Sequence, residues 1–208
     1  MRTGRGEKHC LARAADAGHE AWAAMPLTIA FHRSYFPLLL SLSCVFGGCA
    51  SKPIASFSGG RPILAPDVYF AGHTHSWGIF ETRSGEPTEV LKTVTEGRWD
   101  ADGLYFEQDL FFAKGKQTHR SWLVRRVDAH DFTATGTGIV GVAHGEAYGN
   151  AFHLSFTLDA FPGNPLGHLH MSQWMYLQAD GVTLVNRDSL TKGGVTVAYI
   201  TEQFHKDR

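Results

Sequence analysis

Residues 148–158 read YGNAFHLSFTL, and this stretch decides the fold. Large apolar side chains occupy every second position, and polar side chains occupy the positions between them. The apolar set is Phe152, Leu154, Phe156 and Leu158, and the polar set is His153, Ser155 and Thr157. Because successive side chains of a β-strand point to opposite faces, the pattern predicts a strand with its apolar set in the core and its polar set outside.

Similar short apolar runs recur outward from this stretch, separated by turn signals such as Ser84-Gly85, Asp180-Gly181 and Gly193-Gly194. They predict about nine strands, at residues 69–82, 89–99, 104–112, 119–127, 132–142, 148–158, 169–177, 182–188 and 195–204. Connections this short join antiparallel neighbours, because parallel strands need a long crossover. An antiparallel meander hides its edges by closing on itself. We therefore predict an all-β, lipocalin-like barrel, with a two-sheet sandwich as the competing architecture.

The composition excludes several functions. Lys and Arg together number 19 and Asp and Glu 20, for a net charge of −1, so no basic surface for nucleic acid is expected. With 43% hydrophobic and 19% charged residues the chain can bury a core, which argues against wholesale disorder. There is no G-x-S-x-G motif, no P-loop and no dinucleotide fingerprint. The sequence predicts no cofactor.

An uncharged apolar run precedes the strands. Residues 37–49 read PLLLSLSCVFGGC. The run is shorter than the roughly 20 residues of a membrane-spanning helix, but it suits the apolar region of a signal peptide, which has about 7–15 residues. It ends in Gly47, Gly48 and Cys49, the pattern of a lipoprotein cleavage site, where small residues fit the peptidase and the thiol of Cys49 accepts a diacylglycerol.

This pattern sets the predicted domain organisation. We predict a lipoprotein signal peptide over residues 25–48, lipidation at Cys49, a tether over residues 49–66 and a barrel domain over residues 67–208. Several acyl chains on one cysteine anchor a protein stably, so the membrane is the predicted partner. Ala50 after the cysteine favours the outer membrane, with the protein facing the periplasm. Residues 1–24 are of mixed charge and precede the in-frame Met25; either translation starts at Met25, or these residues are a disordered extension.

Further motifs occur in a fixed order from residue 67 onward. They are Phe70-x-Gly72-x(4)-Trp77-Gly78-x-Phe80, LYFEQDLFF over residues 104–112, Arg120-x-Trp122, Val140-Gly141-x-Ala143-x-Gly145, Gly149-Asn150-Ala151, Trp174-Met175-Tyr176, Asn186-Arg187 and Lys192-x-Gly194. The ordered set resembles an uncharacterised family of bacterial lipoproteins, DUF3833. The resemblance implies a lipocalin-like barrel in the cell envelope, and it implies no established activity.

Charged and aromatic residues on the predicted strands supply candidate ligand-binding residues. They are Trp77, Arg83, Glu107, Arg120, Trp122, His144 and Trp174. Arg120 and Trp122 share a strand face and Glu107 lies one strand earlier, which suggests an Arg–Glu pair inside or at the rim of the barrel. A guanidinium there could orient an anionic headgroup, because its donors match a carboxylate or phosphate. The competing interpretation is a cross-strand ion pair that fixes register.

The histidines offer a second kind of site. His73 and His75 lie two apart, as do His168 and His170, so each pair shares one strand face. Four imidazoles could bind zinc or copper if the fold joined the pairs, but no cysteine pattern supports a metal, and we predict surface histidines and no metal.

Three functions remain open at this point. The leading hypothesis is a lipid-anchored protein that binds a lipid or another apolar ligand in its barrel. The first alternative is an enzyme that acts on lipid or fatty acyl substrates through an Arg/Glu/His cluster. The second is a structural envelope protein with a filled barrel. The sequence does not identify the ligand or the oligomeric state.

Overall fold

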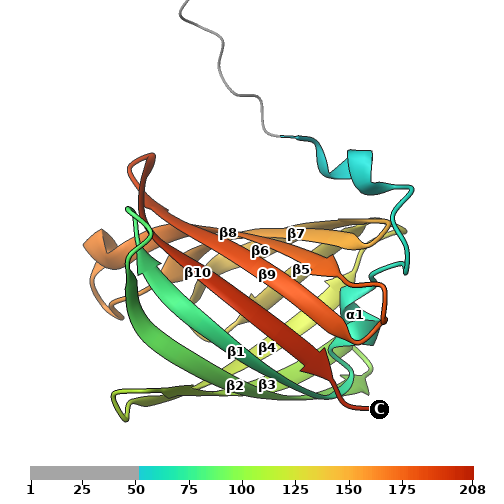
Figure 1. Cartoon of the computed structure of the whole chain (residues 1–208), viewed down its shortest axis with the longest axis horizontal. Coiled ribbons are helices and arrows are strands. Elements are labelled where there is room, and N and C mark those ends of the chain that lie inside the picture. The colour runs from blue at the N-terminus through green and yellow to red at the C-terminus, as the bar shows by residue number, and fades with distance from the viewer. Residues whose placement is uncertain (1–51) are drawn as a thin grey trace, which may run out of the picture. The chain divides into compact units, whose positions relative to one another are not determined.

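The computed structural model describes residues 52–208, so Cys49, the apolar run and residues 1–24 lie outside the described residues. Ten strands form the sheet (Figure 1). They are β1 (Gly72–Thr82), β2 (Pro87–Asp100), β3 (Gly103–Phe112), β4 (Gln117–Arg126), β5 (Asp131–Gly136), β6 (Ile139–Tyr148), β7 (Ala151–Asp159), β8 (His168–Leu177), β9 (Thr183–Lys192) and β10 (Val195–Lys206).

The sheet is a closed antiparallel barrel. Each strand pairs with its neighbours along the chain, and β1 pairs with β10 to close the ring. This confirms the predicted all-β, lipocalin-like barrel and leaves no room for the two-sheet sandwich. Closure gives every strand two partners, so no edge is left unpaired.

One predicted strand is two strands in the structure. The pattern over residues 132–142 predicts a single strand, but β5 ends at Gly136 and β6 begins at Ile139. The hairpin between them turns at Gly138, which has a φ of +76°. Glycine adopts such angles without steric strain. Because apolar residues continue on both sides of this tight turn, the alternation pattern alone does not reveal the turn.

The alternation predicted for residues 148–158 is confirmed. Phe152, Leu154 and Phe156 are buried in the core, and Leu158 is partly buried at the end of the same inward row. His153, Ser155 and Thr157 are half-buried on the outer face. The period of β7 therefore sets which face of this wall lines the interior.

A chain segment before β1 closes one end of the barrel, which we call the helix end. The 3₁₀ helix η1 (Ile54–Phe57) packs on the outer wall, with the ring of Phe57 5.5 Å from that of Tyr176. The short helix α1 (Pro66–Tyr69) then covers the barrel opening. The pattern predicts a tether up to residue 66, but from residue 52 onward the structure seats this segment against the barrel, with Ile54 and Leu64 buried.

Glycine makes the seat for this segment. Gly149, in the turn between β6 and β7, has a φ of +56°, and a Cβ there would lie 1.9 Å from the carbonyl oxygen of Phe57. Its own carbonyl accepts a hydrogen bond of 2.7 Å from the amide of Leu64. The Gly149-Asn150 motif therefore allows the segment to lie close to the wall.

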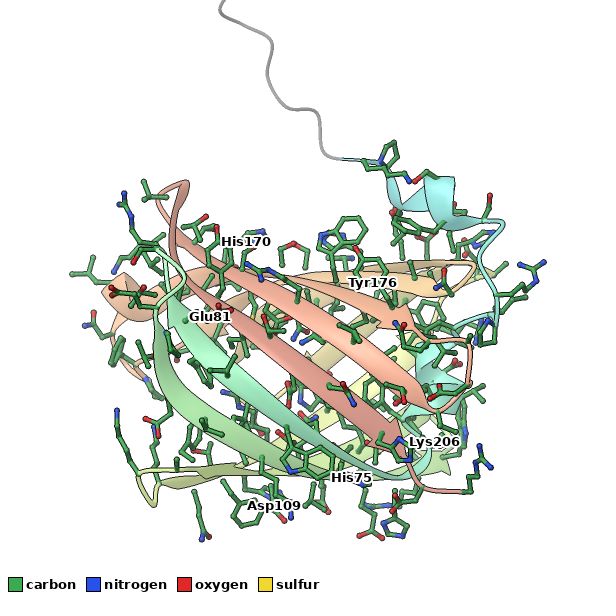
Figure 2. All side chains as sticks on the ribbon, in the orientation of Figure 1. His75, Glu81, Asp109, His170, Tyr176 and Lys206 are labelled. Atoms are coloured by element: carbon green, nitrogen blue, oxygen red, sulfur yellow. The ribbon has the colours of Figure 1, made fainter. Side chains whose placement is uncertain are left out.

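Three sets of side-chain hydrogen bonds hold α1 in place. Tyr69 donates its hydroxyl to the carbonyl oxygen of Val182 at 2.7 Å. Arg126 donates two hydrogen bonds to the carboxylate of Asp67, from Nε at 3.0 Å and from Nη2 at 2.5 Å. Lys206 donates from Nζ to the carbonyl oxygen of Tyr69 at 2.8 Å, and it lies near the C-terminus at the same end of the barrel (Figure 2).

The opposite end, which we call the turn end, is formed by the hairpin turns 83–86, 113–116, 137–138 and 193–194 and by the longer connection 160–167, which contains the 3₁₀ helix η2 (Pro165–Gly167). Glu81 and His170 lie towards this end (Figure 2). Core side chains here are only partly buried; they are Phe80, Ile139, Leu158, Leu169 and Ala198. Across residues 52–208, no helix is long and apolar enough to cross a bilayer.

Candidate ligand-binding site inside the barrel

A cavity of about 120 Å³ lies inside the barrel. Its wall is mostly aromatic and aliphatic, with Phe70 and Phe204 towards the helix end and Phe80 and Leu158 towards the turn end. Ten strands of alternating residues produce this lining, because every second side chain points inward. Such a volume is several times that of one water molecule, about 30 Å³, and an apolar cavity of comparable size can hold a small apolar group.

Arg120 brings a positive charge into this apolar space. It lies on β4, lines the cavity and stands opposite Gln108 in the β3–β4 register. Burial lowers the pKa of Arg120, and the negative charges of Glu202 and Asp188 oppose that shift. Among residues 52–208, no carboxylate oxygen lies within 4.0 Å of its guanidinium nitrogens. The guanidinium thus keeps its donor atoms available to the cavity.

Gln108 and Trp122 are held beside Arg120. The indole Nε1 of Trp122 donates to Oε1 of Gln108 at 2.9 Å, and Nε2 of Gln108 donates to the hydroxyl of Thr95 at 3.2 Å. Trp122 stacks on Phe106 and meets Phe156 edge to face. These contacts fix the polar wall next to the guanidinium.

Glu202 stands on β10 with its carboxylate buried in the same cavity. Ser76 donates a hydrogen bond to its Oε1, and Thr93 donates to the same oxygen at 3.0 Å. Burial raises the pKa of Glu202, while the two hydroxyl donors and the charge of Arg120 act in the opposite direction.

Asp188 on β9 is the second buried acid. Burial raises its pKa to about 8, against the opposing hydrogen bond from Gln173. Nε2 of Gln173 donates to Oδ2 of Asp188 at 3.3 Å, whereas Oδ1 of Asp188 and Oδ1 of Asn186 have no hydrogen-bond partner within the described chain. At neutral pH most molecules hold Asp188 uncharged, so Arg120 faces at most a partial counter-charge from this side.

Neither buried acid is among the predicted site residues, although the alternation of β9 and β10 contains a signal for both. Glu202 lies between Ile200 and Phe204 on the inward face of β10. Asp188 likewise lies on the inward face of β9 that buries Leu190. A charged residue in an apolar row of period two is the sign of a buried polar group.

Of the predicted site residues, Arg120 and Trp122 line the cavity. Glu107 does not: it stands opposite Ser121, whereas Arg120 stands opposite Gln108, so the two side chains point to opposite faces of the wall. The predicted Arg120–Glu107 pair is therefore wrong.

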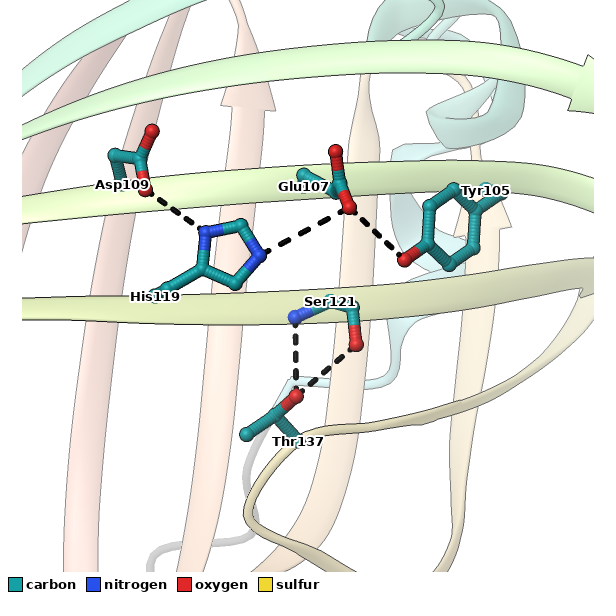
Figure 3. Close-up of polar contacts among 6 residues, drawn as sticks. All are labelled: Tyr105, Glu107, Asp109, His119, Ser121 and Thr137. Atoms are coloured by element: carbon teal, nitrogen blue, oxygen red, sulfur yellow. Dashed lines mark hydrogen bonds and ion pairs between the residues drawn. The ribbon is translucent and has the colours of Figure 1, made fainter.

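On the outer face, Glu107 accepts a hydrogen bond of 3.2 Å from Tyr105 and lies 3.9 Å from Nε2 of His119 (Figure 3). Nδ1 of His119 lies 2.8 Å from Oδ1 of Asp109. The hydrogen bond to Asp109 raises the pKa of His119. Ser121 on the same face bonds to Thr137.

The remaining predicted residues also lie outside the cavity. Trp77 is exposed on the outer face of β1, Arg83 is exposed in the β1–β2 turn, and His144 is exposed on the outer face of β6. Trp174 is half-buried on the outer face of β8, where it stacks on His153 and contacts Phe57 of η1. Since His144 and Glu107 point away from Arg120, the predicted Arg/Glu/His cluster is not formed.

The two histidine pairs begin at different ends of the barrel. His73 and His75 are on the first half of β1, at the helix end, and His168 and His170 begin β8, at the turn end. His75 contacts His205 and Asp207 instead. Across residues 52–208, no group of three or more His, Cys, Asp or Glu side chains is placed to hold a metal ion.

The closed antiparallel barrel with an internal cavity defines the class as a lipocalin-like barrel. An S-type phycobiliprotein lyase from Guillardia theta superposes with a TM-score of 0.53 and 10% sequence identity, covering 76% of this chain and 99% of the lyase. Rv2717c from M. tuberculosis superposes with a TM-score of 0.50 and 15% identity, covering 70% of this chain and 99% of the other. At these identities the likeness shows the fold alone.

The chain belongs to the family described as Protein of unknown function (DUF3833), which matches residues 43–206. This confirms the resemblance seen in the ordered motifs. A comparison with curated proteins finds no match.

Proposed function

We propose that this protein binds, inside its barrel, an apolar molecule that carries a small anionic group. The observation that carries the proposal is the guanidinium of Arg120, which faces a mostly apolar cavity and has no carboxylate oxygen within 4.0 Å among the described residues. Buried charges in proteins are as a rule paired, so a ligand anion is the partner that this position lacks.

The charge balance of the cavity favours an anion. With its pKa at about 8, Asp188 is mostly neutral at pH 7, and burial shifts Glu202 in the same direction. A carboxylate that enters therefore meets one permanent cation and acids that readily hold protons. The fork of a guanidinium accepts a carboxylate through two parallel hydrogen bonds, which gives orientation as well as affinity.

The wall favours an apolar body for the ligand. Phenylalanine and leucine side chains surround the space on both sides of Arg120, and Met171 and Met175 belong to the same wall. Methionine side chains are unbranched and adaptable, so they can move aside for a chain larger than the present cavity. A fatty acid or a related lipid has this combination of an acid group and an alkyl chain.

We further propose that the protein performs this function in the cell envelope, held by acyl chains on Cys49. The support is the uncharged run over residues 37–49 that ends in Gly47, Gly48 and Cys49. An envelope protein anchored beside lipids has direct access to a lipid ligand.

The binding proposal is tested by calorimetric titration with sodium decanoate and with decanol, two probes that share an alkyl chain and differ in the acid group. Decanoate should bind the wild type more tightly than decanol. Arg120→Met should weaken decanoate binding about 10- to 100-fold, because hydrogen bonds to charged groups contribute about 1.5–3 kcal/mol. Decanol binding should change little.

Arg125→Met is the matched control, because Arg125 lies on the same strand, is exposed and does not line the cavity. It should bind decanoate like the wild type. Equal affinity of the wild type for the two probes would contradict the anionic headgroup, and an absence of binding to both would contradict the ligand-binding function. Lipid extraction and native mass spectrometry of protein purified from membranes would then identify the natural ligand.

The anchor is tested separately by metabolic labelling with an alkyne fatty acid. The wild type should be labelled, and Cys49→Ser should lose the label and accumulate as an unprocessed precursor. A labelled Cys49→Ser protein would contradict lipidation at Cys49.

A further inference from the structure

Asp188 has one carboxyl oxygen for which the described chain offers no partner. The side chain is 2% exposed and lines the cavity. Nε2 of Gln173 donates to its Oδ2 at 3.3 Å, whereas its Oδ1 has no hydrogen-bond partner within residues 52–208. Buried polar atoms of proteins are as a rule hydrogen-bonded, so an oxygen of this kind on a cavity wall indicates a contact for a ligand atom.

The contact with Gln173 decides which oxygen of Asp188 carries a proton. A protonated carboxyl group has one O–H donor, and its other oxygen accepts. Because Oδ2 already accepts from Gln173, the proton belongs on Oδ1. Burial raises the pKa of Asp188 to about 8, so this proton is present in most molecules at pH 7. The free oxygen is then a hydrogen-bond donor that points at no acceptor of the described chain.

Few charged groups surround Asp188. Its partners in register are Gln173 on β8 and Ile200 on β10, and neither side chain titrates. Arg120, Glu202 and Asp188 itself are the only ionisable residues among those that line the cavity in the described chain. Besides burial, the charge of Glu202 raises the pKa of Asp188, and the charge of Arg120 lowers it.

Asp188 and Arg120 stand on opposite sides of the barrel. Their strands, β9 and β4, lie five steps apart in either direction around the ten-stranded ring (Figure 1), and both side chains line the one cavity. Among the described residues no carboxylate oxygen lies within 4.0 Å of the guanidinium of Arg120, so the two groups form no direct ion pair. An anionic group between them has a donor on each side.

Glu202 is arranged differently from Asp188. The hydroxyls of Ser76 and Thr93 both donate to its Oε1. Hydrogen bonds that a carboxylate accepts favour its charged form, so these two donors act against the effect of burial on the pKa of Glu202. Of the two buried acids, Glu202 is therefore built to accept hydrogen bonds, and Asp188 is the one with a donor to offer.

We propose that protonated Asp188 is the second headgroup residue of the binding site, and that its Oδ1 donates a hydrogen bond to the carboxylate that Arg120 holds. The inference rests on the proposed function, because it needs the anionic ligand. Ionised Asp188 would instead place a second negative charge beside the ligand, so the carboxylate binds together with a proton. Affinity is full below the pKa of about 8 and falls as the pH rises above it.

The decisive measurement is the number of protons taken up when decanoate binds the wild type. Calorimetric titrations in two buffers of different ionisation enthalpy give this number. Decanoate itself stays ionised above pH 6, because carboxylic acids titrate near pH 4. At pH 8.5 we expect between about half and one proton per decanoate, and at pH 6.5, where Asp188 already holds its proton, almost none. An uptake of zero at pH 8.5 would overturn the proposal.

Two variants of Asp188 separate the hydrogen bond from the charge. Asp188→Asn has an amide that donates but does not titrate. It should bind decanoate within about three-fold of the wild type at pH 6.5, take up no proton at pH 8.5 and keep its affinity as the pH rises. Asp188→Leu removes the donor and should weaken decanoate binding about 10-fold at pH 6.5. Wild-type affinity of Asp188→Leu at that pH would overturn the proposal.

Two further variants assign the proton. Asp102→Asn, in an exposed turn, is the matched control and should take up protons like the wild type. Glu202→Gln should also keep the uptake at pH 8.5, because Asp188 is still present. If Glu202→Gln abolishes the uptake while Asp188→Asn retains it, Glu202 is the coupled acid and the proposal is overturned.

The outcomes also distinguish this inference from the proposed function. If decanoate binds in an Arg120-dependent way, but without proton uptake and equally well in Asp188→Leu, the proposed function stands and the role of Asp188 falls. If decanoate does not bind the wild type at any pH from 6.5 to 8.5, the proposed function fails and this inference fails with it.

Discussion

At the helix end the inward side chains Leu104, Phe132 and Leu184 are fully buried, whereas at the turn end Phe80 and Leu158 remain partly exposed. The difference comes from the connections. The segment before β1 lies across the helix end and adds α1 as a cover, while the turn end has mostly short hairpin turns that cannot reach across a ten-stranded ring. One end of this barrel is therefore covered by a chain segment, and the other is closed only by its own turns and side chains.

The comparison also explains why similar residues have different roles. Arg126 and Arg120 lie on the same strand and belong to the same alternating set. Arg126 meets Asp67 of the cover and forms a bidentate ion pair, but Arg120 lies deeper in the barrel, where no cover segment supplies an acid at bonding distance. Position along the barrel, rather than residue type, decides which arginine is structural.

The largest expected effect comes from a matched pair of phenylalanines. Phe70→Ala should destabilise the protein by about 3–5 kcal/mol, because its buried ring packs on Phe106 and Phe204 under α1. Phe80→Ala at the turn end should cost about 1–2 kcal/mol, because its ring is already partly in solvent. Urea unfolding of both variants measures the difference, and equal losses would mean that the two ends are equally closed.

Loosening the cover should have the next largest effect on stability. Arg126→Met leaves the buried carboxylate of Asp67 without its donors and should cost about 1.5–3 kcal/mol in urea unfolding. Arg125→Met, one residue earlier and exposed, should change the free energy of unfolding very little. If Arg126→Met is as stable as Arg125→Met, the ion pair does not hold the cover.

The buried acids between the two ends should make the stability of the protein depend on pH. Asp188 has a pKa near 8 in the folded protein, against about 3.9 for an aspartate in an unfolded chain. Between these values the folded state binds more protons than the unfolded state, so stability falls as the pH rises from about 4 to 8. Glu202 adds to the same slope.

The melting temperature of Asp188→Asn should therefore fall less between pH 5 and pH 8 than that of the wild type. Asp102→Asn, in an exposed turn, should keep the wild-type slope. The measurement is the melting temperature at several pH values in this range. An unchanged slope in Asp188→Asn would place the proton uptake elsewhere.

The smallest effect is expected on the outer wall, away from both ends. Asp109→Asn should lower the pKa of His119 in an NMR titration, because the hydrogen bond to Asp109 is what raises it. The stabilisation from this pair is present below the pKa of an unfolded histidine and is lost as the pH rises through the folded pKa. Stability should change little, because the pair is exposed. A loss of decanoate binding in Asp109→Asn would show that the wall does not insulate the cavity.

The facing of side chains was predictable where it depends only on the alternation within one strand. The inward-facing residues of β7 followed from the alternation in its own sequence. Arg120 and Trp122 both line the cavity, in agreement with their shared strand face. The break between β5 and β6 was not predictable from alternation, because apolar residues continue on both sides of Gly138. The Arg120–Glu107 pair failed for a related reason: neighbouring strands place two residues close together, but register decides whether they share a face.

By itself the sequence determined that this chain forms an antiparallel, all-β meander, because alternation and turn residues act between neighbours along the chain. The closure of the meander into a barrel, rather than a two-sheet sandwich, was decided by the pairing of β1 with β10. Only the tertiary structure decided that Arg120, Asp188 and Glu202, from strands β4, β9 and β10, face one cavity. It also decided that the segment before β1 covers one end and leaves the other partly open. The physical reason is that ring closure brings together residues that are far apart in sequence. The distances between these residues and their common burial set their charge states, and both exist only once the ring has closed.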